Sequence, residues 1–306
     1  MLVTGASGFI GRHLCRTLQN RGAHVIAIVH GKTSRELVVA EEYHADLQDR
    51  EAIRAFVRSA TPDHVVHLAA VNVRGTALAD YRLSYRANLI ATLDLAEAVI
   101  DTGPCQRFVY LSSAEEYGCA PVPFNFAVRE APLTAYGLSK LAATQLLQAI
   151  ATTHGLPIAV LRATVVYGPG QQGSMFVPAL VRALVGGVRF PMTAGDQKRD
   201  LVYVDDVVDG ILRALVMTAR HDEALHLSAG TPVTIRDVAL LTARLAGGNA
   251  ESLLEFGAVP YRPGEAMEYW AGNSDTQVAL GWSPSVTLED GLSRTIAHYR
   301  EALADK

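Results

Sequence analysis

Apolar and polar positions alternate in blocks along the first half of the chain. Short apolar runs such as Leu2–Thr4 and Ala23–Val29 predict strands that are covered on both faces. The longer segments between them carry apolar residues at helical spacing. The expected strands are Leu2–Thr4, Ala23–Val29, Tyr43–Asp46, His64–Ala69, Arg107–Ser112 and Pro157–Val166, and the expected helices are Arg50–Ala60, Tyr81–Thr102 and Thr134–His154. Repeated strand–helix units of these lengths predict an α/β fold with a doubly wound parallel sheet.

The pattern changes after Tyr167, where the regular alternation of strands and helices is lost. The elements expected beyond it are helices at Met175–Leu184, Asp205–Ala219, Thr234–Leu245, Asp275–Leu280 and Leu288–Leu303, and a strand at Ala224–Ser228. We therefore expect a first domain at residues 1–167 and a smaller C-terminal α/β domain at residues 168–306, with part of 200–235 packing back on the first.

Composition narrows the class of protein. The chain has 306 residues, of which 49% are hydrophobic and 19% charged, as in a folded globular protein. A net charge of -4 argues against nucleic acid as a partner. The three cysteines show no C-x-x-C spacing, so neither a disulfide framework nor a thiolate metal site is expected. No apolar stretch reaches the roughly 18 residues of a membrane-spanning helix, and no signal peptide precedes the first strand. We expect a cytoplasmic protein that binds no metal and no membrane.

Gly5, Gly8 and Gly11 follow the first strand with the spacing G-x-x-G-x-x-G and lead into a helical pattern. Glycine lets the backbone approach phosphate oxygens and lets the helix pack closely on the strand. The N-terminus of that helix offers N–H donors and the positive end of a dipole. The strand, turn and helix together predict a site for a dinucleotide pyrophosphate, and hence a Rossmann-type sheet. A plain connection between strand and helix is the alternative.

Tyr136 and Lys140 open the expected helix Thr134–His154 and, being four residues apart, lie on one of its faces. A phenol with a reference pKa of about 10 is a poor base at neutral pH, and a neighbouring ammonium lowers that value. Ser113 ends a strand at the sheet edge where ligands bind. The three residues fit a proton-transfer set opposite a hydride carrier. Taken alone, the pair also fits a tyrosine packed under the sheet and a lysine in solvent.

These residues are part of a wider set of motifs, which are Gly5-x-x-Gly8-x-x-Gly11, His67-Leu-Ala-Ala70, Asn88, Ser113, Tyr136-x-x-x-Lys140 and Leu161-Arg-Ala-Thr-Val-Val-Tyr-Gly-Pro-Gly170. With this set the chain resembles the extended short-chain dehydrogenase/reductase family, and within it the nucleotide-sugar epimerases, dehydratases and reductases. The resemblance implies that Tyr136 is the catalytic acid/base with Ser113 beside it, and that Lys140 binds the nicotinamide ribose and lowers the pKa of the tyrosine. It also implies that the second domain binds the nucleotide sugar, and that the helices Tyr81–Thr102 and Thr134–His154 form the interface of a homodimer.

The candidates for cofactor binding are Gly5, Ser7, Gly8, Phe9, Ile10, Gly11, Arg12, His30, Lys32, Asp46, Leu47, Leu68, Ala69, Ala70, Asn88, Tyr136 and Lys140. The resemblance places Leu68–Ala70 along the cofactor and Asp46-Leu47 at its adenine. An acidic residue at the end of the second strand would bind the ribose hydroxyl of NAD, but here the chain runs from His30 to the basic Lys32 and Arg35. With Arg12, these groups favour the 2′-phosphate of NADP, and NAD is the alternative if they are ordinary surface charges.

The candidates for substrate binding are Ser113, Ala114, Glu115, Thr164, Arg199 and Arg262. Arg199-Asp200 and Arg262-Pro-Gly264 match motifs that bind substrate phosphates in the family, and guanidinium groups suit phosphate oxygens. Surface ion pairs are the alternative for both arginines. Thr164 lies where many epimerases similar to this chain have Asn.

The stretch after Ser113 bears on the reaction. Similar 4,6-dehydratases often carry an Asp-Glu pair there, and the two acids move protons at C5 and C6 of the sugar. Here Ala114 takes the Asp position, Glu115 is kept as a catalytic candidate, and Glu116 is expected to be a solvated loop charge.

The function favoured at this point is NADPH-dependent reduction of the C4 keto group of a nucleotide-linked 4-keto-6-deoxyhexose, because a reductase exchanges NADP with the pool in every cycle. The catalytic residues would be Ser113, Glu115, Tyr136 and Lys140. The alternative is a nucleotide-sugar 4-epimerase or 4,6-dehydratase with tightly bound NAD. A redox-sensing NADP-binding regulator is a third interpretation, which the retained tyrosine–lysine pair disfavours.

Overall fold

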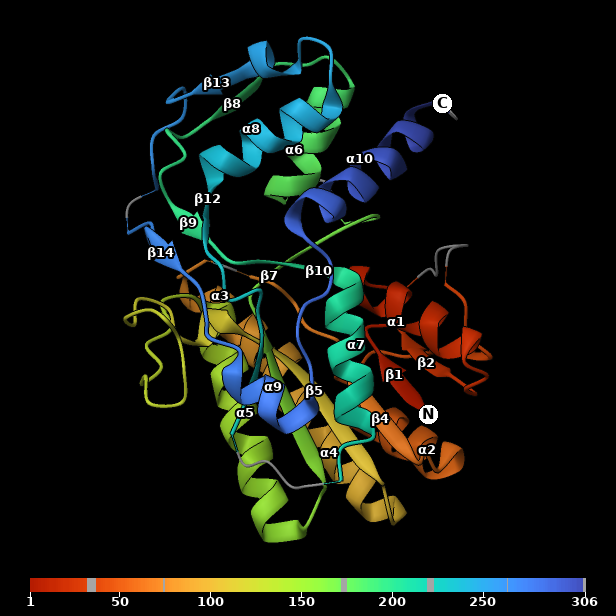
Figure 1. Cartoon of the computed structure of the whole chain (residues 1–306). Coiled ribbons are helices and arrows are strands. Elements are labelled where there is room, and N and C mark those ends of the chain that lie inside the picture. The colour runs from red at the N-terminus through yellow and green to blue at the C-terminus, as the bar shows by residue number, and fades with distance from the viewer. Residues whose placement is uncertain (32–36, 74, 172–174, 219–222, 263, 305–306) are drawn as a thin grey trace.

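A parallel sheet forms the centre of the molecule (Figure 1). The computed structural model describes residues 1–31, 37–73, 75–171, 175–218, 223–262 and 264–304. Within these residues, seven strands pair in the order β3-β2-β1-β4-β5-β6-β11, and each neighbouring pair is parallel. The strands are β1 (Leu2–Thr4), β2 (Ile26–Val29), β3 (Glu41–His44), β4 (His64–His67), β5 (Arg107–Ser113), β6 (Ile158–Ala163) and β11 (Leu225–Leu227). The predicted doubly wound parallel sheet is confirmed.

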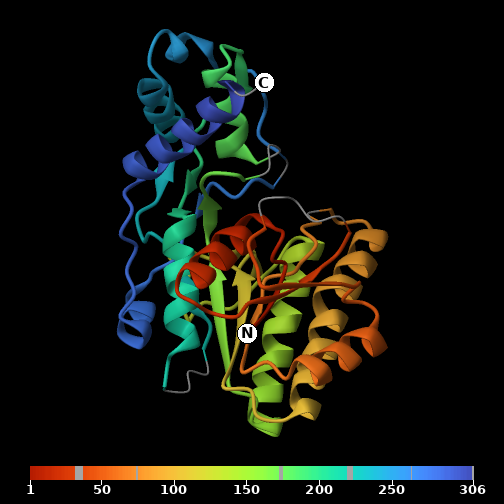
Figure 2. The ribbon, with the colours of Figure 1, turned by 90° about the vertical axis from the view of Figure 1, so that its right-hand side faces the viewer.

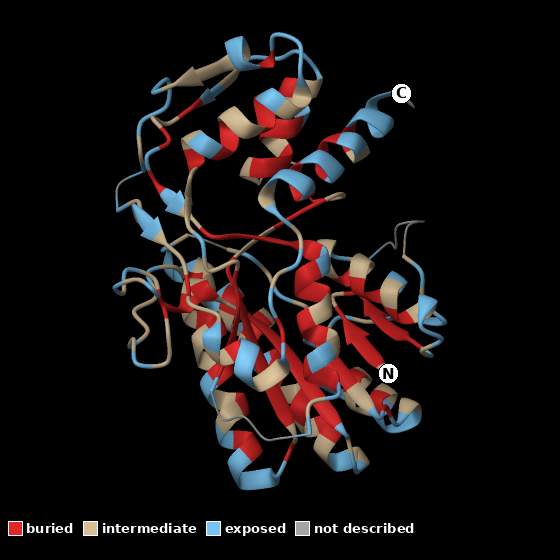
Figure 3. Cartoon of the chain, in the orientation of Figure 1, coloured by how far each residue is buried: buried red, intermediate tan, exposed pale blue. Residues whose placement is uncertain are grey.

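Helices cover both faces of this sheet. One face packs on α1 (Phe9–Asn20) and α7 (Val204–Leu215), and the other packs on α2 (Arg50–Ala60), α4 (Ala91–Thr102) and α5 (Ala135–His154). Side chains alternate along each strand, so that Val3 and Val66 face α1 and α7 while Leu2 and Val65 face the opposite layer. The strands other than the edge strand β3 are therefore buried on both sides, as Figure 3 shows. We call the sheet with these helices the sheet body.

A second lobe stands beyond one end of the sheet body (Figure 1, Figure 2). Its helices are α6 (Phe176–Val185), α8 (Ile235–Ala246) and α10 (Leu288–Ala304), with the 3-10 turn Ala250–Leu253 and the parallel pair β8 (Phe190–Met192) and β13 (Leu254–Phe256). Apolar residues of α6 and α8, such as Leu180 and Ala239, pack together and form its core. No helix within the described residues is both long and apolar enough to cross a membrane.

Short strands connect the two parts. The parallel pair is β7 (Val165–Tyr167) and β10 (Leu201–Tyr203), and β9 (Lys198–Arg199) lies between β12 (Val233–Thr234) and β14 (Glu268–Tyr269). Helix α9 (Ser274–Leu280) lies against β11. After β10 the chain returns to the sheet body, where α7 packs beside α1 and β11 joins the central sheet. It leaves the sheet body again at β12.

Two predicted elements are interrupted. The helix expected at Tyr81–Thr102 consists of α3 (Leu78–Ser84), a π-helical turn at Tyr85–Ile90 and α4. The strand expected at Pro157–Val166 divides at Thr164 into β6 and β7. The strand divides because its hydrogen-bonding partner changes. The Thr164 N–H donates to the Leu227 carbonyl oxygen in the central sheet, and the Val165 N–H donates to the Asp200 carbonyl oxygen between β9 and β10.

Candidate active site

The glycines of the turn after β1 lie where neighbouring backbone approaches closely. Gly5 has a φ of +69°, and a Cβ there would lie 2.6 Å from the backbone nitrogen of Ala69. A Cβ at Gly11 would lie 2.2 Å from the carbonyl oxygen of Gly5, so α1 packs directly on the turn. Gly8 is the N-cap of α1 and has no side chain with which to cap it. The first-turn N–H groups of α1 therefore suit an anionic ligand such as a pyrophosphate.

Other cofactor candidates surround this turn. Leu68 and Ala69 are bound to Thr4 by hydrogen bonds at the end of β1. Ser7, Phe9 and Ile10 are half-buried and Ala70 is exposed. At the ends of β2 and β3, His30 Nε2 lies 4.0 Å from Asp46 Oδ2, and the adjoining Leu47 packs on the core. Lys32 and Arg35 lie outside the described residues.

Arg12 is engaged with the loop that leads to the second lobe. Its Nη2 donates to the Gly170 carbonyl oxygen at 2.8 Å. The neighbouring His13 contacts the Pro169 carbonyl oxygen at 2.9 Å. The guanidinium thus makes a contact between α1 and residues 168–171, a role that the sequence motif did not indicate.

Helix α5 presents the proposed acid/base. Thr134 caps it, because the Gly137 N–H donates to Thr134 Oγ1 at 3.0 Å. Tyr136 is half-buried, whereas Lys140 is 1% exposed. Lys140 Nζ donates to the Leu111 carbonyl oxygen at 2.7 Å and lies 4.1 Å from the centre of the Tyr110 ring. Burial lowers the pKa of Lys140 to about 7. The alternative of a lysine in solvent is wrong.

A 3-10 turn, Ala114–Glu116, follows β5 and lies against the start of α5. Ser113 caps it, since the Glu115 N–H donates to Ser113 Oγ at 3.1 Å. A Cβ at Gly137 would lie 2.5 Å from the Glu115 carbonyl oxygen, so the turn and the helix are in direct contact. Ala114 is fully buried and Glu115 is half-buried. The structure therefore brings Ser113 and Glu115 to the same end of the sheet as the first turn of α5.

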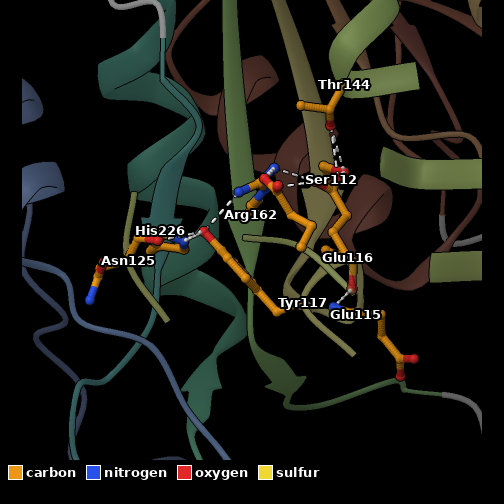
Figure 4. Close-up of polar contacts among 10 residues, drawn as sticks. Ser112, Glu115, Glu116, Tyr117, Asn125, Thr144, Arg162 and His226 are labelled. Atoms are coloured by element: carbon orange, nitrogen blue, oxygen red, sulfur yellow. Dashed lines mark hydrogen bonds and ion pairs between the residues drawn. The ribbon is translucent and has the colours of Figure 1, made fainter. Parts of the chain in front are cut away.

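Glu116 is not a solvated loop charge, as the sequence suggested, but is fully buried. Its polar contacts are drawn in Figure 4. It accepts hydrogen bonds from Ser112 Oγ, from Thr144 Oγ1 at 2.8 Å and from Arg162 Nε at 2.7 Å. Burial lowers the pKa of Arg162, but the charges of Glu116, Tyr117 and Glu130 together outweigh it, so the pKa of the guanidinium is raised. Arg162 was the sequence signal for a buried carboxylate. A charged residue inside the buried strand β6 requires a buried partner.

Arg162 extends this network toward the surface. Its Nη2 lies 2.6 Å from Glu130 Oε1, and its Nη1 donates to the Tyr117 hydroxyl at 2.7 Å. The Tyr117 oxygen is 2.9 Å from His226 Nε2 on β11. Burial lowers the pKa of His226 to about 3, so its imidazole is neutral. We call Glu116, Arg162, Glu130, Tyr117 and His226 the buried network.

Asn88, a cofactor candidate, uses its side-chain amide within the protein. It bonds to both backbone groups of Val71 and donates to Ser139 Oγ at 2.9 Å, and Ser139 in turn donates to the Tyr136 carbonyl oxygen. The π-helical turn carries Asn88 to this buried position. His67 adds a second connection, since it lies 2.6 Å from Thr4 Oγ1 and 2.8 Å from Thr92 Oγ1. These bonds connect β1 and β4 with the start of α5.

Of the candidates in the second half of the chain, Arg199 ends β9 and Thr164 lies between β6 and β7. Arg199 is paired with Glu265 and donates to the Ala266 carbonyl oxygen at 2.8 Å. Burial lowers the pKa of Arg199, and the carboxylates of Glu265 and Glu115 oppose that shift, which indicates that Arg199 is near the 3-10 turn. Arg262 is exposed.

Thr164 is buried, and its hydroxyl donates toward Asp200 Oδ1 at 3.3 Å. Asp200 also accepts from the N–H groups of Ala229 and Gly230. The Thr164 side chain thus serves the junction between β6 and β7. Within the described residues, no group of three or more His, Cys, Asp or Glu side chains is arranged to bind a metal ion.

The comparison with known proteins agrees with this geometry. Residues 1–230 match the model of the NAD-dependent epimerase/dehydratase family. The chain is 28% identical to the dTDP-glucose 4,6-dehydratase of Streptomyces niveus, over 98% of this chain and 93% of the relative. It is 26% identical to the UDP-glucuronate 4-epimerase of Thermodesulfobacterium geofontis, over 98% of this chain and 96% of the relative.

Solved structures show the same relationship. The UDP-glucose 4-epimerase of Thermotoga maritima, solved with UDP-glucose, has a TM-score of 0.91 and 28% identity, with 99% of each chain covered. MoeE5 in complex with UDP-glucose and NAD has a TM-score of 0.87 and 32% identity, with 99% of each chain covered. The chain is therefore an enzyme of the NAD-dependent epimerase/dehydratase family, within the extended short-chain dehydrogenase/reductase group that its motifs indicate.

Proposed function

We propose that the protein is a nucleotide-sugar 4-epimerase that acts on a UDP-linked hexose with a tightly bound NAD. The observation that carries the proposal is the contact between the Ser113 turn and the start of α5, next to Tyr136 and the buried Lys140. Proteins of similar structure hold UDP-glucose, and one of them holds NAD as well. These neighbours support the class of substrate and the choice of cofactor.

The chain's own residues supply the proton transfer. Bound NAD would take a hydride from C4 of the sugar and return it to the opposite face. Tyr136, as a phenolate, removes the proton of the 4-hydroxyl and later returns it, while the Lys140 ammonium stabilises the phenolate. The Ser113 oxygen accepts a hydrogen bond from the Glu115 N–H, and its own O–H donates to the sugar oxygen.

Ala114 favours epimerisation over dehydration. Inversion at C4 needs no proton transfer at C5 or C6, so it needs no acid beyond Tyr136. The residue after Ser113 is a fully buried alanine, whose methyl group cannot move a proton. The reduction of a 4-keto-6-deoxy sugar, favoured by the sequence, has less support than this alternative, because the relatives reported above are epimerases and dehydratases.

NAD is also better supported than NADP. The prediction of NADP depended on Arg12 and on Lys32 and Arg35 after His30, and Lys32 and Arg35 lie outside the described residues. Arg12 is bound to the Gly170 carbonyl oxygen, and His30 lies beside the carboxylate of Asp46, which repels a 2′-phosphate. Mass spectrometry of the nucleotide released on denaturation should detect NAD. Release of NADP alone would contradict the proposal.

A 4,6-dehydratase is the second candidate, and Glu115 is the observation that favours it. A half-buried carboxylate lies beside Ser113, where it could remove a proton at C5. The two candidates differ in product. Incubation with UDP-glucose and dTDP-glucose, followed by proton NMR, should show inversion at C4 with both hydroxymethyl protons retained. Formation of a 4-keto-6-deoxy sugar, lost in Glu115→Gln, would establish the dehydratase instead.

We also propose that the enzyme is a homodimer. Leu83 and Ile90 are 48% and 47% exposed on α3 and the π-helical turn, which pack against α5. Leu95 and Leu147 of the two long helices are fully buried in the sheet body, and Leu93 and Leu146 pack partly on its core. Leu83 and Ile90, with Leu78 at the start of α3, which is 79% exposed, are apolar groups that these elements leave for a partner.

A further inference from the structure

Glu116 is a fully buried carboxylate that the proposed reaction does not use. Its Oε1 accepts from Ser112 Oγ and, at 2.8 Å, from Thr144 Oγ1, and its Oε2 accepts from Arg162 Nε at 2.7 Å. Removing a carboxylate from water is unfavourable unless it is paired and hydrogen-bonded. Donors from three different elements satisfy this one. Burial raises the pKa of Glu116, and the Arg162 charge and the hydrogen bonds from Ser112 and Thr144 oppose that shift and favour the carboxylate.

The three donors lie on β5, α5 and β6, and two of these elements carry the proposed catalytic residues. Ser112 directly precedes Ser113 at the end of β5. Thr144 lies one helical turn beyond Lys140, on the face of α5 that carries Tyr136 and Lys140. Arg162 comes from β6, the next strand in the sheet. The carboxylate thus bonds the strand that ends in Ser113 directly to the helix that carries the acid/base (Figure 4).

Glu116 also supplies charge near Lys140. Lys140 Nζ lies 4.1 Å from the centre of the Tyr110 ring on β5, and Tyr136 and Thr144 lie one helical turn to either side of it on α5. Glu116, bonded to Thr144, and His67 on β4 are the titratable groups that interact electrostatically with the ammonium. Burial keeps His67 neutral and lowers the pKa of Lys140 to about 7, and the Glu116 charge opposes the second shift.

We propose that Glu116 is a positioning residue of the reaction, whose carboxylate holds Ser113 against the catalytic face of α5 and provides the negative charge that keeps Lys140 protonated. This inference rests on the proposed roles of Ser113, Tyr136 and Lys140. It assigns the buried network a part in catalysis, whereas a network that only stabilised the fold would leave the pH dependence of the rate unchanged.

The test compares Glu116→Gln with the parent in C4 inversion of UDP-glucose, with rates divided by the content of bound NAD. We expect kcat to fall about 10- to 100-fold, because a small misplacement of catalytic groups has effects of that size, with KM within about twofold. The alkaline limb of the kcat profile should move about one pH unit lower, because Lys140 loses the charge that favours its protonated form. An unchanged kcat or an unchanged limb would overturn the inference.

Glu130→Gln is the matched control, because it removes a carboxylate from the same arginine without contact to Ser112 or Thr144 in the bonds described above. The alkaline limb of its kcat profile should stay at the pH of the parent. A shift equal to that of Glu116→Gln would refute the role of Glu116.

Thr144→Val removes the hydrogen bond between Glu116 and α5 and keeps the ion pair with Arg162. It should therefore lower kcat without moving the alkaline limb. Thr144→Val also tests the inference if Glu116→Gln does not fold, because a parent-like kcat in Thr144→Val would refute the positioning role of Glu116. An active Tyr136→Phe enzyme would instead refute the proposed function.

Discussion

Tyr136 is the side chain on which the proposed proton transfer depends. It lies in the first turn of α5, next to the Ser113 turn and one helical turn from Lys140. Tyr136→Phe should lower kcat about 100- to 10,000-fold, the range of general acid–base catalysis. Bound NAD should remain near the parent content, because the pyrophosphate turn is untouched. A spectrophotometric assay of C4 inversion measures the effect, and parent-like turnover would exclude Tyr136 as the acid/base.

His226 makes stability depend on pH. Burial lowers its pKa to about 3 in the folded protein, against 6.5 in the unfolded chain. Between these values the unfolded chain binds a proton that the folded protein does not, so stability falls as the pH falls. Such a group contributes a slope of about 1.4 kcal/mol per pH unit within this window. Urea unfolding at about pH 6 and about pH 4.5 should show a shallower loss for His226→Gln than for the parent. Equal slopes would show that His226 is charged in the fold.

Single residues were predictable where a motif fixes their chemistry. Ser113 ends β5, as its place after the predicted strand indicated, and Lys140 lies one helical turn from Tyr136 in α5, as their spacing predicted. Glu116 was misjudged because a polar tripeptide after a strand has the composition of a solvated loop. Its direction depends on the 3-10 turn and on Arg162, which is 46 residues away. A contact at that separation leaves no periodic signal in the sequence.

The glycine turn can be tested as an element. A Cβ at Gly11 would lie 2.2 Å from the Gly5 carbonyl oxygen, so Gly11→Ala must move α1 away from β1. We expect loss of the retained NAD and a lower midpoint of thermal unfolding, because the helix N-terminus no longer faces the pyrophosphate. At Gly272 the nearest atom to a Cβ would be 4.0 Å away, so Gly272→Ala is the control and should keep both properties. Retention of NAD by Gly11→Ala would contradict the assignment of the turn.

The predicted elements are accurate where their interactions are local in the sequence and inaccurate where they depend on distant segments. The helix Arg50–Ala60 has the predicted bounds, because its caps and its apolar face are local. The connecting strands β9, β12 and β14 were not predicted, since two-residue strands exist only through pairing with distant segments. The π-helical turn in Tyr81–Thr102 was missed for the same reason, because Asn88 in this turn bonds to Val71 and Ser139 outside the helix.

The arrangement of the whole molecule depends on where the chain crosses between its two parts. Residues 201–203 pair with β7, α7 then packs beside α1, and β11 joins the sheet next to β6. This return places Asp200 beside Thr164 at the junction. Apolar periodicity predicted the helices but carries no information on which face of the sheet each one covers, so the packing of α7 beside α1 required the structure.

The proposed homodimer is a prediction about the assembled molecule. Leu83 and Ile90 are about half exposed on a segment that packs on α5, the same helix that carries Tyr136. Light scattering should give twice the chain mass of 32.8 kDa for the parent. The double variant Leu83→Glu with Ile90→Glu should give the monomer mass, because it places charges in an apolar contact. Val278, 89% exposed on α9, provides the control, and Val278→Glu should stay dimeric. A monomeric parent would refute the assembly, whereas a dimeric double variant would place the interface on another surface.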